Sequence, residues 1–221
     1  MYKHLYDNFA HWYHNNMGTV YFYSDPHFND EEIKYLRSNY IGDMEQVTRI
    51  NSKVGRCDTI VFLGDIGDVD FIRYIRGYKV LIMGNHDAGA ANYKRKQVLI
   101  GTVEEYKDKL HQKGYYESVG YVWYDNELFD EVYEGVLTIA PNIILSHEPV
   151  GDFPYAINIH GHTHNSNNKY NMCAENINYT PVPIKRFIED GISKKVVNIH
   201  RETIDKATER KRKRKWVIQK D

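Results

Sequence analysis

The chain has 221 residues, a formal net charge of −1 and 42% hydrophobic residues, enough to build one α/β core without disulfides. Its two cysteines exclude a disulfide framework, no apolar stretch is long enough to cross a bilayer, and the first residues lack the pattern of a secretory signal. We therefore expect a single-domain cytoplasmic protein that does not enter membranes.

The first half of the chain predicts a parallel sheet. Short runs of β-branched and aromatic residues predict buried strands at residues 19–24, 59–63 and 78–83. Apolar residues at helical spacing predict interrupted helical structure over residues 30–54, and residues 70–76 predict a shorter helix. This βαβαβ order is typical of parallel strands joined by crossover helices.

The second half continues with alternating elements. Residues 103–113 predict a helix, residues 143–146, 157–160 and 170–173 resemble strands, and residues 184–189 predict a short helix after two prolines. We therefore expect further strands beyond the βαβαβ half.

The segment 115–133 is dense in aromatic residues with partial alternation. Such a segment can line a substrate groove or stack on bases. It can also form ordinary strand and core, because strands favour aromatic side chains on packing grounds. The second interpretation is favoured.

Clusters of metal-binding side chains follow five of the strand-like runs. They are Asp25-Pro26-His27, Gly64-Asp65-Ile66-Gly67-Asp68, Gly84-Asn85-His86-Asp87, Ser146-His147-Glu148-Pro149 and His160-Gly161-His162-Thr163-His164. Ligands bind beyond the carboxyl ends of strands in open α/β sheets, where loops converge. Carboxylate, imidazole and amide ligands together favour a borderline metal such as Mn²⁺, Fe or Zn²⁺ over a calcium cage or a thiolate zinc site.

The glycine-containing clusters suggest individual roles. Asp65 follows Gly64 directly after a buried strand, so we expect it to project into the loop cluster as a bridging carboxylate. Adjacent residues rarely all face one ion, so Asn85 is the expected ligand in its cluster. That choice leaves His86 available for proton transfer, with Asp87 as a partner that fixes its tautomer.

The remaining clusters add histidines to the same centre. Asp25 and His27 can face one side of a loop and share an ion, and His162 and His164 face the same way in extended backbone. His147 follows an apolar run and can reach the same ions. The other histidines are expected to be surface or hydrogen-bonded residues: His4, His11, His14, His111 and His200. This number of ligands suggests a bridged pair of ions about 3.5 to 4 Å apart.

In order and spacing, the five clusters resemble the full signature of the calcineurin-like metallophosphoesterases over residues 19–183. The resemblance implies a four-layer α/β/β/α sandwich. It implies that Asp25, His27, Asp65 and His164 hold a first metal, and that Asp65, Asn85, His147 and His162 hold a second. It also implies that His86 contacts the scissile phosphate and protonates the leaving oxygen.

The function implied is hydrolysis of phosphate esters by two divalent ions, which we expect to be Mn, Fe, Zn or Ni. Two cations lower the pKa of a bridging water, so that hydroxide attacks phosphorus directly, and they neutralise the developing charge. Phosphodiesters are favoured. The alternatives are a phosphomonoesterase or phosphoprotein phosphatase on the same site, or a non-catalytic binding module stabilised by metal. A metallo-β-lactamase-like hydrolase is excluded because Asn165 and His164 do not match that motif.

The last residues form a separate basic segment. We expect a metallophosphoesterase domain over residues 1–200 and a basic helix or tail over residues 201–221, in which residues 210–215 are six consecutive positive charges. Such a run can contact nucleic-acid phosphates. It can also be a solvated terminal helix, or one docked through Trp216 and its apolar neighbours, and this interpretation is favoured.

Overall fold

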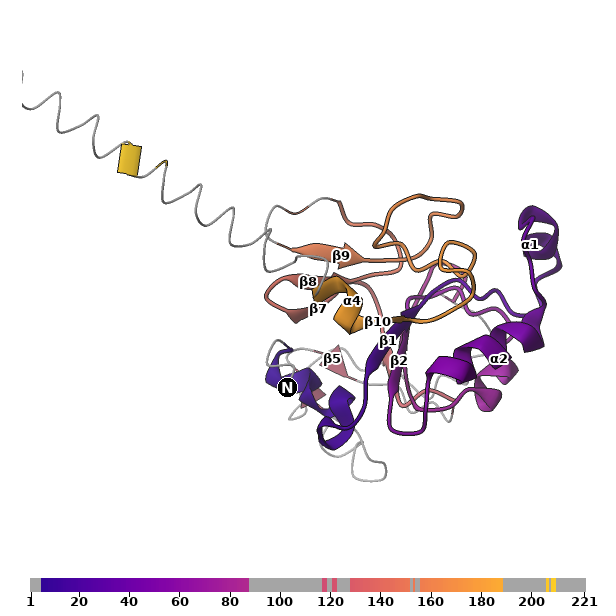
Figure 1. Ribbon diagram of the computed structural model, residues 1–221, viewed down its shortest axis with the longest axis horizontal. Coiled ribbons are helices and arrows are strands. Elements are labelled where there is room, and N and C mark those ends of the chain that lie inside the picture. The colour runs from indigo at the N-terminus through magenta and orange to yellow at the C-terminus, as the bar shows by residue number, and fades with distance from the viewer. Residues whose placement is uncertain are drawn as a thin grey trace, which may run out of the picture.

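The computed structural model describes residues 5–87, 117–118, 121–122, 128–151, 153, 156–188, 206 and 208–209 (Figure 1). The predicted helix at residues 103–113, much of the aromatic segment and the basic run at residues 210–215 lie outside this part of the chain. Within it, no helix has the length and apolar character needed to span a membrane.

The main sheet has five strands in the order β10-β1-β2-β3-β6. They are β10 (Val182–Pro183), β1 (Val20–Tyr23), β2 (Thr59–Phe62), β3 (Tyr78–Ile82) and β6 (Glu131–Tyr133). Strands β1, β2, β3 and β6 are parallel, and β10 runs antiparallel to β1. The parallel sheet predicted from the first half of the chain is therefore confirmed.

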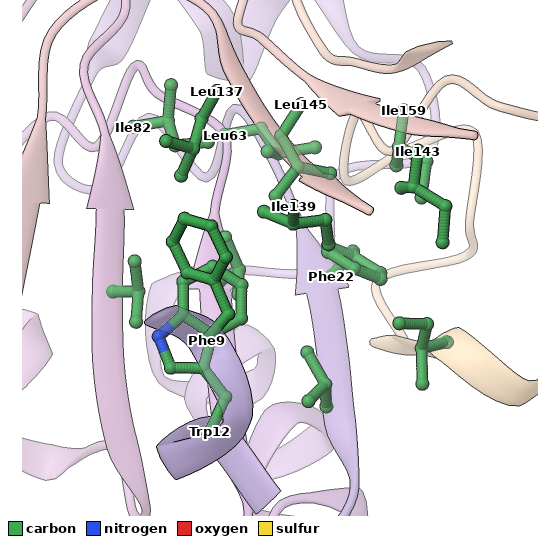
Figure 2. Close-up of a cluster of buried hydrophobic side chains, with 14 of the residues drawn as sticks. Phe9, Trp12, Phe22, Leu63, Ile82, Leu137, Ile139, Ile143, Leu145 and Ile159 are labelled. Atoms are coloured by element: carbon green, nitrogen blue, oxygen red, sulfur yellow. The ribbon is translucent and has the colours of Figure 1, made fainter. Parts of the chain in front are cut away.

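A second sheet faces the first. It consists of β7 (Leu137–Ala140), β8 (Ile143–Leu145) and β9 (Ile157–Ile159), with β7 antiparallel and β9 parallel to β8. Side chains of the two sheets meet in one apolar core, where those of β1 and β3 lie opposite those of β7, β8 and β9 (Figure 2). Strands β4 (Glu117–Ser118) and β5 (Tyr121–Val122) form a separate two-stranded antiparallel sheet.

Helical segments cover the other face of the main sheet. Helix α2 (Asp43–Lys53) buries Val47 and Ile50, and the 3-10 segment η2 (Val69–Tyr74) buries Ile72, in a second apolar cluster. The same cluster contains β2 residues that point away from the core between the sheets. The described residues thus form helix, sheet and sheet layers of the predicted α/β sandwich.

The interrupted helical pattern at residues 30–54 becomes two helices. Helix α1 (Glu31–Leu36) begins after Asp30, whose side chain accepts hydrogen bonds from the backbone amides of Glu32 and Ile33. This capping satisfies donors that a helix start leaves without partners. Because the cap residue Asp30 lies three residues after His27, the cap also fixes the loop that carries the first metal-binding cluster.

An amino-terminal segment was not predicted, and one predicted strand does not form. The amino-terminal 3-10 segment η1 (Asp7–Asn16) packs Trp12 into the core between the sheets. Residues 170–173 do not form the predicted strand; two isolated bridges, Ser24 to Cys173 and His160 to Asn171, occur there instead. Ser24 follows a strand of the main sheet and His160 follows β9, so this segment joins the two sheets and extends neither. The predicted final helix is present as α4 (Ile184–Phe187).

Candidate metal centre

The five predicted clusters come together where the two sheets meet. Candidate donor atoms lie within 4.8 Å of one another in three groups: Asp25, His27 and Asp65; Asp65, His147 and His162; and Asp25, His164 and Cys173. Asp65 belongs to the first two groups, and Asp25 belongs to the first and the third. Loops separated by more than 130 residues in sequence therefore converge on one small region.

The first half of the centre has buried atoms without hydrogen-bond partners. His27 Nε2 lies 3.6 Å from Asp65 Oδ2 and 3.9 Å from Asp25 Oδ1, and His164 Nε2 lies 3.7 Å from Asp25 Oδ1. Asp25 Oδ1 and His27 Nε2 are buried and make no hydrogen bond within the described part of the chain. Buried polar atoms normally have a partner, so these atoms fit a cation between them.

In the second half of the centre, one ring nitrogen of His147 lies close to three other atoms that can bind a metal. His147 Nε2 lies 2.8 Å from Asn85 Oδ1, 3.1 Å from His162 Nδ1 and 3.3 Å from Asp65 Oδ2. The other ring nitrogen, His147 Nδ1, lies 2.7 Å from the carbonyl oxygen of Leu63. Donation to that carbonyl leaves Nε2 as an acceptor among other acceptors, an arrangement that requires a cation or a proton.

The pKa values of these groups agree with a site built for positive charge. Burial alone would lower the pKa of His147, but its hydrogen bond to Asp65 and the nearby carboxylates outweigh burial and raise the pKa to about 9. Burial opposes ionisation of Asp65, yet the hydrogen bond and charge of His147 lower the pKa of that carboxyl. Burial lowers the pKa of His27, which keeps this imidazole neutral as a ligand must be.

Several predicted ligands have a backbone conformation that is unusual for residues other than glycine. The φ angles are 53° at Asp25, 46° at His27, 53° at Asp65 and 63° at His162. Each such residue costs on the order of 1–3 kcal/mol, and strain of this kind is concentrated at functional sites. The surrounding structure must therefore hold these loops in place.

Glycines allow the loops to approach. A Cβ atom on Gly84 would lie 2.2 Å from Asp65 Oδ1, and one on Gly161 would lie 1.9 Å from Ser24 Oγ. Gly64 has a φ of 96°, and a Cβ there would lie 2.6 Å from His147 Nδ1. The glycines beside the predicted ligands are thus required by close contact as well as by backbone angle.

Asp87 holds two of the loops together. Its buried carboxylate accepts hydrogen bonds from the backbone amides of Asp65 at 2.8 Å, Ile66 at 3.0 Å and Gly84 at 2.8 Å. The sequence suggested a role toward His86, which stays a prediction. The backbone contacts add a second role, because they fix the loop after β2 against the loop after β3.

His86 lies on the open side of the centre. Its side chain is exposed, its ring centroid is 5.5 Å from that of His27, and its backbone amide donates to Asp65 Oδ1 at 3.0 Å. The neighbouring Asn85 and His162 are also exposed. A ligand arriving from solvent therefore meets these three side chains first.

A family model for calcineurin-like phosphoesterases matches residues 18–219, nearly the whole chain. The chain belongs to the calcineurin-like phosphoesterase family. A crystal structure of a protein of unknown function from Aquifex aeolicus has 23% sequence identity and a TM-score of 0.52, covering 78% of this chain and 98% of that one, and so shares the fold. A search of curated proteins gave no significant match.

Membership of the calcineurin-like phosphoesterases confirms the predicted α/β sandwich and supports a metal-dependent hydrolase of phosphate esters. The clustered Asp and His side chains support binding of divalent metal. Pro26 and His160, which stand within two of the predicted clusters, are not among the groups of candidate donor atoms.

Other residues at this calcineurin-like centre were not anticipated from the sequence. Asp25 Oδ2 accepts hydrogen bonds from Ser24 Oγ, from the backbone amide of His162 at 2.9 Å and from Cys173 Sγ at 3.3 Å. These donors occupy one oxygen of Asp25 and leave the other toward the site. Glu175 lies 2.7 Å from His164. Only Ser24, directly before Asp25, had a position in the sequence that signalled its role.

Proposed function

We propose that this chain is a dinuclear-metal-dependent phosphoesterase that favours phosphodiesters. The observation that carries the proposal is the pair of buried atoms, Asp25 Oδ1 and His27 Nε2, that have no hydrogen-bond partner among the described residues and lie beside the carboxylate of Asp65. A purely structural cluster of polar residues would have satisfied these atoms internally.

The proposed ligands form two overlapping sets. Asp25, His27, Asp65 and His164 hold one ion, and Asp65, Asn85, His147 and His162 hold the other. This mixture of carboxylate, imidazole and amide suits Mn, Fe, Zn or Ni. When bound, two such ions supply Lewis-acid chemistry, which lowers the pKa of water and neutralises charge on a phosphate.

The chain's own residues supply orientation and proton transfer. The histidines His27 and His147 each have a protein acceptor at Nδ1, Asp30 Oδ2 at 3.0 Å and the carbonyl oxygen of Leu63 at 2.7 Å, so their Nε2 atoms face the centre. We assign to His86 the contact with the phosphate and protonation of the leaving oxygen; its exposed side chain, 5.5 Å from the ring of His27 between centroids, supports this role.

Exposure of three side chains at the centre supports the proposed preference for diesters. Asn85, His86 and His162 are exposed on one side of the centre, which lets a substrate extend in two directions from phosphorus. A phosphomonoesterase or phosphoprotein phosphatase using the same residues is the second candidate.

We also propose that the domain spans residues 1–200 and that residues 201–221 form a basic extension. Its six consecutive positive charges would add affinity for a nucleic-acid substrate, which salt dependence of binding would reveal. The two cysteines are both free thiols, which fits a cytoplasmic location.

The test is hydrolysis of an aryl phosphodiester and an aryl phosphomonoester by Mn²⁺-loaded protein. We expect turnover of both with the diester preferred, loss of turnover in Asp65→Asn, and a loss of about 100-fold or more in His86→Asn, the range for general acid catalysis. His11→Asn is the matched control, because His11 lies in η1 near the amino end of the parallel strands.

Preference for the monoester would favour the second candidate. Absence of turnover on both substrates, with metal bound, would instead support a non-catalytic binding module.

A further inference from the structure

A buried ion pair lies directly behind the first half of the metal centre. Arg37, just after α1, and Glu175, in the turn region before β10, each have only 2% of the side chain exposed. Arg37 Nε and Glu175 Oε2 are 3.0 Å apart, although they do not have hydrogen-bond geometry. Burying two charges is costly, and such pairs often add little to stability. The pair therefore calls for a further explanation.

The second oxygen of Glu175 supplies one. Glu175 Oε1 lies 2.7 Å from Nδ1 of His164, whereas a terminal nitrogen of Arg37 lies 3.4 Å from the same atom. The shorter contact makes the carboxylate the partner of Nδ1, and a carboxylate can only accept its proton. The ring then presents the lone pair of Nε2 toward Asp25 Oδ1, 3.7 Å away. A carboxylate behind a histidine in this way fixes the tautomer and ring orientation of a metal ligand and increases its basicity.

Arg37 connects the same carboxylate to the first metal-binding loop. One terminal nitrogen of its guanidinium donates to the carbonyl oxygen of Asp25 at 2.7 Å, and the other lies 3.5 Å from that of Pro26. The ion pair thus links Asp25 and His164, which are 139 residues apart in sequence and share an edge of the site.

We propose that Glu175, held by Arg37, is a positioning residue that orients His164 and sets the affinity of the first metal position. The proposal rests on the proposed two-metal function. His27 and His147 have other acceptors at Nδ1, Asp30 and the Leu63 carbonyl, so Glu175 acts on one position only.

The experiment is a calorimetric titration of the metal-free full-length chain with Mn²⁺, combined with thermal melting. Glu175→Gln removes the charge while keeping the shape. Because it leaves Arg37 buried without its counter-charge, the double variant Arg37→Met/Glu175→Gln removes both charges together. The matched control is Glu45→Gln, which breaks an ion pair to Arg49 of the same 3.0 Å separation on the exposed surface of α2.

We expect one of the two Mn²⁺ affinities to fall about 10- to 100-fold in both Glu175 variants, the range found for such partners of ligands. The other affinity, and both affinities of Glu45→Gln, should match wild type. Unchanged affinities in Glu175→Gln would overturn the proposal. The proposal would also be overturned if Glu175→Gln weakened Mn²⁺ binding at both positions and the double variant restored both the affinities and the melting temperature. That result would mean that the single variant only destabilises the fold. If wild type itself binds no Mn²⁺, the proposed function fails instead.

Discussion

Replacing Asp87 by Asn tests whether one buried carboxylate holds the metal-binding loops together. Its two oxygens accept hydrogen bonds from three backbone amides, those of Asp65, Ile66 and Gly84, at 2.8 to 3.0 Å. Asparagine has only one oxygen acceptor. Its NH₂ group would face at least one amide that now donates to a carboxylate.

The size of the effect follows from these contacts. A hydrogen bond to a charged group contributes about 1.5–3 kcal/mol, and a buried donor without a partner costs about 1–3 kcal/mol. Loss of one bond and weakening of the others should therefore lower the free energy of unfolding by about 3 kcal/mol. For a chain of this size that corresponds to a melting temperature lower by about 6–12 °C. Mn²⁺ affinity should fall as well, because the loops that carry Asp65 and Asn85 lose their connection.

Thermal melting and Mn²⁺ titration of the purified variant measure both effects. Asp58→Asn is the control: Asp58 also accepts from two backbone amides, those of Thr19 and Gly55, both at 2.7 Å, but it precedes β2 whereas the site follows it. This control should lose stability and keep its metal affinity. Wild-type melting and wild-type affinity in Asp87→Asn would refute the reasoning.

Three further predictions concern pH, close packing and a remote network. The pKa of His147 is raised from 6.5 to about 9 in the metal-free protein, so a bound proton must leave when a cation binds. Mn²⁺ affinity should rise about tenfold per pH unit from about pH 7 to 9, and a flat calorimetric profile would contradict this. The same shift stabilises the metal-free fold below about pH 6.5, and melting should show this contribution lost as pH rises through about 9. Gly161→Ala should weaken Mn²⁺ binding and cost about 1–3 kcal/mol, because its Cβ would lie 2.2 Å from Asp25 Oδ2. By contrast, Gly135→Ala, whose Cβ meets no described atom within 4 Å, should keep metal affinity, and equal affinities in both variants would count against the packing argument. Glu131→Gln should lower stability by about 2 kcal/mol and leave Mn²⁺ titration unchanged, because this buried carboxylate accepts from a tryptophan and a tyrosine near η1; an unchanged melting curve would refute that role.

The convergence of the five clusters was predictable, because each cluster follows a run of residues typical of a strand. The runs before Asp65 and Asn85 are β-branched and apolar, and a parallel sheet brings their carboxyl ends to one edge. The type and order of the side chains then limit the chemistry. What the sequence indicated was therefore a set of ligands and the edge at which they meet.

The residues behind the ligands could not be predicted, because nothing local marks them. Glu175 lies in a turn region whose position depends on bridges from Cys173 and Asn171 to different sheets. Arg37 is an ordinary charged residue after a short helix, where a solvent-exposed side chain is the usual expectation. Only the assembled fold places these two side chains together behind His164.

The 3-10 segment η1 was missed for a related reason. Its aromatic and polar residues show no clear helical period, and its conformation depends on contacts with distant strands. Trp12 donates to Glu131 at 2.8 Å and packs against Phe9 at a ring distance of 5.0 Å. Tertiary packing, rather than local propensity, determines this segment.

The most direct test of the central claim is an anomalous-difference map from crystals soaked in Mn²⁺. The structure predicts two peaks about 3.5 to 4 Å apart, the spacing of two-metal sites, with Asp65 shared between them. Asp25, His27 and His164 should surround one peak, and Asn85, His147 and His162 the other. A map with no peak at Asp65, or with a single peak bound by none of the histidines, would contradict the account.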